Sequence, residues 1–142
     1  MATGAANASG GLECKIEDNA VRFDVSAGVT HGMGSPTFNF KGELAVRDRR
    51  IAEDLRSVSF DGDNRPQYWL DDKELRLVLY KERTADKAFG SIELTIRTEI
   101  SDRDTTGNFT GTYKLSISDP ATSTSGDGGT TDFTGAVTCF AE

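Results

Sequence analysis

His31 and Ser35 are the residues that first suggest nucleophilic chemistry, because they lie four positions apart in a glycine-rich stretch. A serine nucleophile needs a histidine base, an acid that orients this base, and an oxyanion hole. His31 is the only histidine, and no Gly-x-Ser-x-Gly or Ser-x-x-Lys motif is present. The sequence therefore gives no support to nucleophilic catalysis, and His31 is expected to be an exposed loop residue.

Two oxygen-rich turns are the next group that could do chemistry. One histidine and two distant cysteines cannot supply a zinc site, but calcium takes oxygen ligands from loops. The first turn carries Asp61, Asp63 and Asn64, and the second carries Asp102, Asp104 and Asn108. Asp and Asn also favour turns through hydrogen bonds to the nearby backbone. We therefore expect structural turns without metal or cofactor, while calcium binding stays open.

Paired carboxylates could hydrolyse glycosidic bonds. Glu93 and Glu99 are one candidate pair, but both fall on the expected outer face of a strand. Asp71 and Asp72 are a second pair, and adjacent residues of a strand point to opposite sides. A carboxylate-based hydrolase is therefore the least favoured of the functions considered, and we expect no enzyme.

Cys14 and Cys139 are the only cysteines and lie near the two ends of the chain. Each sits in a short alternating run that predicts a strand, the first and the last of the domain. A disulfide between them would make the terminal strands neighbours and would fit an exported protein. The alternative is a pair of free buried cysteines in a cytosolic protein.

Exposed aromatic and loop residues are the candidate contacts for a partner. Tyr68 and Trp69 follow Arg65 and Pro66 near the end of an expected strand. Trp69 is either a core residue that plugs one end of a barrel or an anchor for a protein or a sugar. Three loops, 30–36, 61–72 and 120–129, are candidate contact surfaces. The candidate partner-binding residues are His31, Met33, Arg65, Tyr68 and Trp69.

Alternation of apolar and polar residues dominates the chain and predicts an all-β domain. Val21, Phe23 and Val25 share one face of the clearest early strand. About eight strands with mostly short connections predict antiparallel neighbours in a closed or nearly closed barrel, or in a two-sheet β-sandwich. Phe-x-Gly recurs at Phe40, Phe109 and Phe133, where glycine would allow the bends that closure needs. Residues 50–56 could form one helical turn.

The segment 107–113, Gly-Asn-Phe-Thr-Gly-Thr-Tyr, resembles a strand of the avidin family. The resemblance implies a hairpin of an eight-stranded barrel. Several tryptophans wall the biotin pocket of that family, whereas Trp69 is the only tryptophan here. Biotin binding is therefore not part of what the resemblance implies. In size, class and acidity the chain is also similar to small periplasmic lysozyme inhibitors.

Length and charge limit the remaining possibilities. A chain of 142 residues is one domain, which we expect over 12–142 behind a flexible segment, 1–11. The net charge of −7 argues against nucleic acid as a partner. Most cations lie between Lys41 and Lys87, and none follows Leu115. The chain contains no run of 18 apolar residues, so we expect no membrane insertion.

These observations favour one function over two others. The sequence predicts a periplasmic or secreted, non-enzymatic domain that binds another protein, as an inhibitor or an immunity-type module does. The first alternative is a calycin-like carrier of a small ligand inside the barrel. The second is the carboxylate-based hydrolase.

Overall fold

The computed structural model describes residues 9–30, 37–65, 67–71, 73–83, 89–100, 107–120 and 129–141. Within these ranges the chain forms nine strands and two short helical turns. The strands are β1 (Ser9–Glu17), β2 (Val21–Thr30), β3 (Thr37–Val46), β4 (Ser57–Asp61), β5 (Gln67–Leu70), β6 (Glu74–Glu82), β7 (Ser91–Ile100), β8 (Asn108–Ser118) and β9 (Thr130–Ala141). The helical turns are α2 (Glu53–Arg56), inside the stretch where one turn was expected, and the 3-10 turn η1 (Gly62–Asn64).

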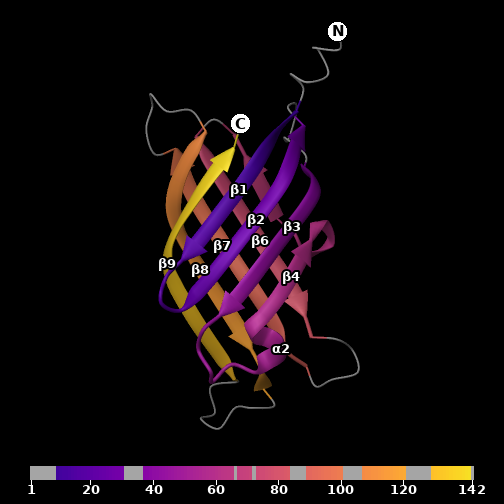
Figure 1. Ribbon diagram of the computed structural model, residues 1–142, viewed down its shortest axis with the longest axis vertical. Coiled ribbons are helices and arrows are strands. Elements are labelled where there is room, and N and C mark those ends of the chain that lie inside the picture. The colour runs from indigo at the N-terminus through magenta and orange to yellow at the C-terminus, as the bar shows by residue number, and fades with distance from the viewer. Residues whose placement is uncertain are drawn as a thin grey trace.

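All nine strands belong to one antiparallel sheet in the order β4-β3-β2-β1-β9-β8-β7-β6-β5. The sheet curls into a half-barrel, and Figure 1 shows β1 lying beside β9. The prediction of an all-β, barrel-like fold is confirmed, and the strands form one sheet rather than the two of a sandwich. β1 begins at Ser9, earlier than the boundary expected at Leu12, because Gly10 and Gly11 pair with β2.

The alternation seen in the sequence places apolar side chains inside the half-barrel. In β2 the residues Val21, Phe23 and Val25 are buried, whereas Arg22 and Asp24 are exposed. The same alternation recurs in the other long strands, although the first half of β9 is only partly buried, and the core they form is continuous. Full burial of one such large apolar side chain stabilises a fold by about 1.5–3 kcal/mol.

Glycines of the Phe-x-Gly segments lie on the inner face of the sheet. A Cβ atom at Gly111 would overlap the carbonyl oxygen of Arg97 on β7. At Gly135 a Cβ atom would lie 2.9 Å from the ring of Tyr113 and 2.7 Å from Asp18 Oδ2. Only glycine allows these close approaches at Gly111 and Gly135, whereas a Cβ atom at Gly42 would lie no closer than 3.4 Å to its neighbours.

The strand count exceeds the prediction of about eight because β5 and β6 are separate strands. Asp71 Oδ1 accepts hydrogen bonds from the amides of Lys73 and Glu74, at 2.8 Å each. The Asp71 amide donates to the Glu74 carbonyl at 3.1 Å. These bonds turn the chain back on itself after Leu70, so the aromatic segment pairs with β6 instead of preceding it in line.

Side chains bridge the two ends of the sheet order, β4 and the β5–β6 hairpin. Lys81 Nζ donates to the Ser59 carbonyl at 2.6 Å. Arg83, which follows β6, lies 2.8 Å from Asp54 of α2 and 3.0 Å from Asp119 at the end of β8. Hydrogen bonds to Asp119 and Asp54 raise the pKa of the Arg83 guanidinium, so it stays charged. Arg83, Asp54 and Asp119 together are called the Arg83 clasp below.

Candidate functional site

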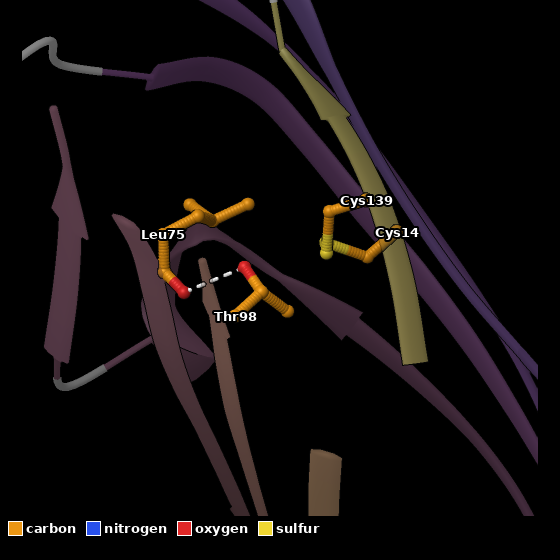
Figure 2. The surroundings of a disulfide bond; sticks show 4 residues. All are labelled: Cys14, Leu75, Thr98 and Cys139. Carbon is orange, nitrogen blue, oxygen red and sulfur yellow. Dashed lines mark hydrogen bonds between the residues drawn. A yellow bond between two sulfur atoms is a disulfide. The ribbon is translucent and has the colours of Figure 1, made fainter. Parts of the chain in front are cut away.

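The predicted disulfide joins β1 and β9. Cys14 and Cys139 occupy directly opposite positions of the two strands, with their Cα atoms 4.0 Å apart and their sulfur atoms bonded. Both side chains are buried. In Figure 2 the disulfide points toward the opposite wall, where Thr98 Oγ1 donates a 2.9 Å hydrogen bond to the Leu75 carbonyl. The bond therefore lies in the core, where it reinforces the structure.

Tyr68 and Trp69 lie on opposite faces of β5, because neighbouring residues of a strand point to opposite sides. Tyr68 packs against the core. The side chain of Trp69 points outward and is 55% exposed. The expectation that Trp69 is a core residue is wrong, because its side chain is exposed, and the inward aromatic of this segment is Tyr68. The role of Trp69 as an anchor stays a prediction.

Asp71 holds the indole of Trp69 in place. Trp69 Nε1 donates to Asp71 Oδ2 at 3.0 Å, while Asp71 Oδ1 accepts the two turn amides described above. The amides of Glu74 and Lys73, with a smaller contribution from the indole, lower the pKa of Asp71 below its usual value of 3.8. The carboxylate is therefore charged at neutral pH and fixes both the hairpin turn and the aromatic side chain.

A row of outward side chains runs from Trp69 across the sheet. Trp69 is opposite Arg76 of β6, and Arg76 is opposite Arg97 of β7. Both arginines are exposed. Like charges at directly opposite positions of neighbouring strands destabilise a sheet. The row therefore combines an exposed aromatic side chain with two cations whose closeness does not help the fold.

The surface beside this row is hollowed. A hollow of about 730 Å³ is bordered by outward side chains of three strands. We call it the Trp69 groove, and the outward residues that define it are Gln67, Trp69, Glu74, Arg76, Val78, Thr95 and Arg97. A second hollow of about 390 Å³ continues toward β8 and shares Glu74, Arg76 and Arg97 with the first. The two arginines thus stand between two depressions of one outer face.

Arg65 lies on the inner side, away from the Trp69 groove. Its guanidinium carbon is 4.8 Å from the centre of the Tyr68 ring and 5.7 Å from that of Phe40, and Nη1 donates to Thr37 Oγ1. Desolvation by burial raises the pKa of Tyr68, although the charge of Arg65 opposes this shift. Arg65 and Tyr68 therefore form a cation–π contact on the face of β5 opposite to Trp69.

The other residues singled out in the sequence lie in turns, on the outer face or outside the described residues. Asp61 Oδ1 accepts from the Asp63 amide, and the Asp61 amide donates to Asn64 Oδ1, which is a local turn arrangement. Glu93 and Glu99 are exposed on β7. His31 and Met33, with Asp72, Asp102 and Asp104, fall outside the described residues. Within the described residues no group of three or more Cys, His, Asp or Glu side chains could hold a metal ion.

Sequence reasoning missed Arg76, Arg97 and the role of Asp71 as a support for Trp69. The two arginines are far apart in the chain, and only the strand register brings them together. The spacing Trp-x-Asp at a hairpin turn was the one local signal, since a turn carboxylate two residues after an indole can accept its N–H.

Comparison with family models, with curated proteins and with solved structures finds no match to this chain. Among the described residues no helix has the length and apolar character needed to cross a membrane.

Proposed function

We propose that this chain is an exported, non-enzymatic β-domain that binds another protein through the Trp69 groove. The observation that carries the proposal is the exposed indole of Trp69 beside two opposed guanidinium groups. Tryptophan and arginine are the side chains most enriched among residues that dominate protein–protein binding. Asp71 holds the indole in one orientation before any partner arrives, which lowers the entropic cost of binding.

Export to a periplasm or beyond is the second part of the proposal. The Cys14–Cys139 disulfide supports it, because disulfides persist in oxidising compartments and are rare in the cytosol. The disulfide is buried, so a reductant would reach it only after local opening of β1 and β9.

The test compares capture of extracytoplasmic proteins by three forms of the chain: wild type, Trp69→Ala and Phe140→Ala. Phe140 is a matched control, because it is an outward aromatic residue on β9 that is 38% exposed and lies outside the groove. The captured protein is then purified and its Kd measured. We expect Trp69→Ala to weaken binding at least tenfold and Phe140→Ala to leave it unchanged. A captured protein that binds Trp69→Ala as tightly as wild type would remove the groove from the proposal.

The alternatives have less support. Leu75, Leu77 and Leu79 point inward with no exposed surface, which favours a filled interior over the cavity of a calycin-like carrier. Saturable binding of a lipophilic dye that an unlabelled ligand competes away would support the calycin-like carrier instead. Likewise, pH-dependent hydrolysis of any glycan in a test panel would support the carboxylate-based hydrolase.

A further inference from the structure

We infer that the element held by the Trp69 groove is an acidic, extended peptide segment of the partner, an inference that rests on the proposed function. Arg76 and Arg97 are directly opposite each other, which places their Cβ atoms about 4.5–5.5 Å apart. Glu74 already pairs with Arg76, and a partner carboxylate between the two guanidinium groups would relieve the repulsion that remains. Guanidinium groups also bind carboxylates with two parallel hydrogen bonds, which adds geometric selectivity.

The two arginines are not equivalent. Arg76 Nη2 lies 3.0 Å from Glu74 Oε2, so this guanidinium is already paired and oriented. The ion pairs formed within the described part of the chain do not include Arg97. Arg97 is therefore the cation available to a partner, and Arg76 flanks it.

The surroundings of the arginine row give the carboxylate one favourable direction of approach. Glu74 and Glu99 are opposite each other on one side of the row and repel an anion. On the other side Thr95 is opposite Lys114 of β8. An acidic group therefore reaches Arg97 from the side of Thr95 and Lys114, across the floor of the groove.

Strand spacing fixes the sequence pattern of the segment. Trp69 lies on β5 and Arg97 on β7, two strand positions apart, which is about 9–10 Å at the usual spacing of about 4.8 Å. An extended peptide in the polyproline II conformation advances about 3.1 Å per residue and has three residues per turn, so side chains three positions apart share one face and lie about 9 Å apart. The segment should carry an apolar residue that packs on Trp69 and Val78, and an Asp or Glu three positions away.

A displayed library of nine-residue peptides tests this pattern. The library is enriched on the wild-type protein after removal of sequences that bind Trp69→Ala. We expect the enriched peptides to share an apolar or aromatic residue and an Asp or Glu three positions apart. Enriched sequences that are neutral or basic, or that show no fixed spacing, would overturn the acidic segment while leaving the groove as a binding site. Failure to enrich any Trp69-dependent peptide would instead count against the proposed function and the inference together.

The charge requirement is tested on the best peptide. We expect Arg97→Gln to weaken its binding about tenfold and to abolish the difference between the peptide and its Glu→Gln form. Lys15→Gln on β1 is the control, since this exposed cation lies outside the groove. Equal loss in both variants would show non-specific attraction and would contradict the inference. Polygalacturonate is titrated in parallel, and tighter Trp69-dependent binding than that of the best peptide would replace the peptide by an acidic polysaccharide.

Discussion

The hydroxyl of Tyr113 donates a 2.6 Å hydrogen bond to Asp18 Oδ2 and ties β8 to the turn between β1 and β2. Asp18 Oδ1 also accepts the amides of Ala20 and Val21. Burial alone would raise the pKa of Asp18, but these hydrogen bonds outweigh it and hold the pKa below its usual value of 3.8. Asp18 therefore contributes to stability above about pH 4, and this contribution is lost as the pH falls through the lowered pKa.

We expect Tyr113→Phe to lower the free energy of unfolding by about 1–2 kcal/mol, because a partly buried hydrogen bond to a charged acceptor is lost. The urea midpoint, measured from pH 7 to pH 2, checks this. The difference from wild type should begin to shrink below about pH 4 and disappear as the pH falls through the lowered pKa of Asp18, because protonation of Asp18 weakens the bond in the wild type. Tyr80→Phe, at an exposed position of β6, serves as the control and should change nothing. A difference that is independent of pH would contradict the role given to Asp18.

Asp71 gives a second prediction at this scale. Trp69 is the only tryptophan, so its fluorescence reports on one side chain alone. We expect Asp71→Ala to release the indole, with a shorter anisotropy decay and more quenching by acrylamide. Asp48→Ala removes another turn carboxylate that caps the Arg50 amide, and it should leave the Trp69 signal unchanged. An unaltered anisotropy decay in Asp71→Ala would mean that other contacts position the indole.

The Arg83 clasp joins elements that the backbone ladder does not join. Side chains of Arg83 and Asp119 are only 8% and 7% exposed, and Gly90 makes room for the guanidinium, since a Cβ atom there would lie 3.1 Å from Arg83 Cζ. We expect Arg83→Met to cost about 3–5 kcal/mol, because it leaves a buried carboxylate without its counter-ion. Urea unfolding measures this cost.

Two further variants interpret the result. Arg83→Met combined with Asp119→Asn should recover part of the loss, because the unpaired charge is removed. Arg50→Met breaks an ion pair whose arginine is 82% exposed, and it should be neutral. If the double variant is no more stable than Arg83→Met alone, the cost comes from lost packing rather than from the buried charge.

Most strands could be predicted from the sequence, because burial of one strand face makes apolar and polar residues alternate with a period of two. Val21, Phe23 and Val25 were placed inward on that basis and are buried. The division into β5 and β6 was not accessible. It depends on Asp71 accepting two amides, and the polar residues after Leu70 could equally have lain within a continuing strand.

The candidate site was less accessible than the fold. The sequence analysis named Trp69 as a candidate contact residue, and the other candidates near it were drawn from the same stretch of sequence. Tyr68 is adjacent to Trp69 in the strand and therefore points to the opposite, inward face. Arg65 lies on that side as well, against the Tyr68 ring. The true neighbours, Arg76 and Arg97, depend on the register of two hairpins, which composition and alternation do not specify.

At the scale of the whole molecule, the sheet consists of two meanders. One contains β1 to β4 and the other contains β5 to β9, and each pairs its strands in chain order. The ladder between β1 and β9 is short, from Leu12 to Lys15, and it contains the Cys14–Cys139 disulfide at its centre. The second junction is the side-chain bridge between β4 with α2 and the end of β6, which includes the Arg83 clasp. The disulfide therefore lies at the short β1–β9 ladder, and the ion pairs of Arg83 lie where side chains, rather than backbone hydrogen bonds, connect the two meanders.

Removal of the disulfide tests the first junction. The two cysteines are 125 residues apart, and closing a loop of this length is worth about 4–5 kcal/mol in the chain-entropy model. We expect Cys14→Ala with Cys139→Ala to lower the unfolding free energy by up to that amount. Hydrogen exchange should become faster first at the β1–β9 ladder. Uniformly faster exchange over all strands would argue that the short ladder is not a weak point.

The two junctions close one ring, and a cycle of variants can measure their cooperation. Each junction, once formed, holds the two meanders in the position that the other requires. Removal of either junction should therefore lower the unfolding free energy by the strength of that junction's own interaction, and also by the stabilisation that it gave to the other junction. When both are lost, this shared advantage is lost only once. We expect the unfolding cost of the combined cysteine and Arg83→Met variant to be smaller than the sum of the separate costs by about 0.5–3 kcal/mol, the range of coupling between cooperating sites. Strict additivity would mean that the meanders are held independently at each junction, and the half-barrel would then behave as two units that share an edge.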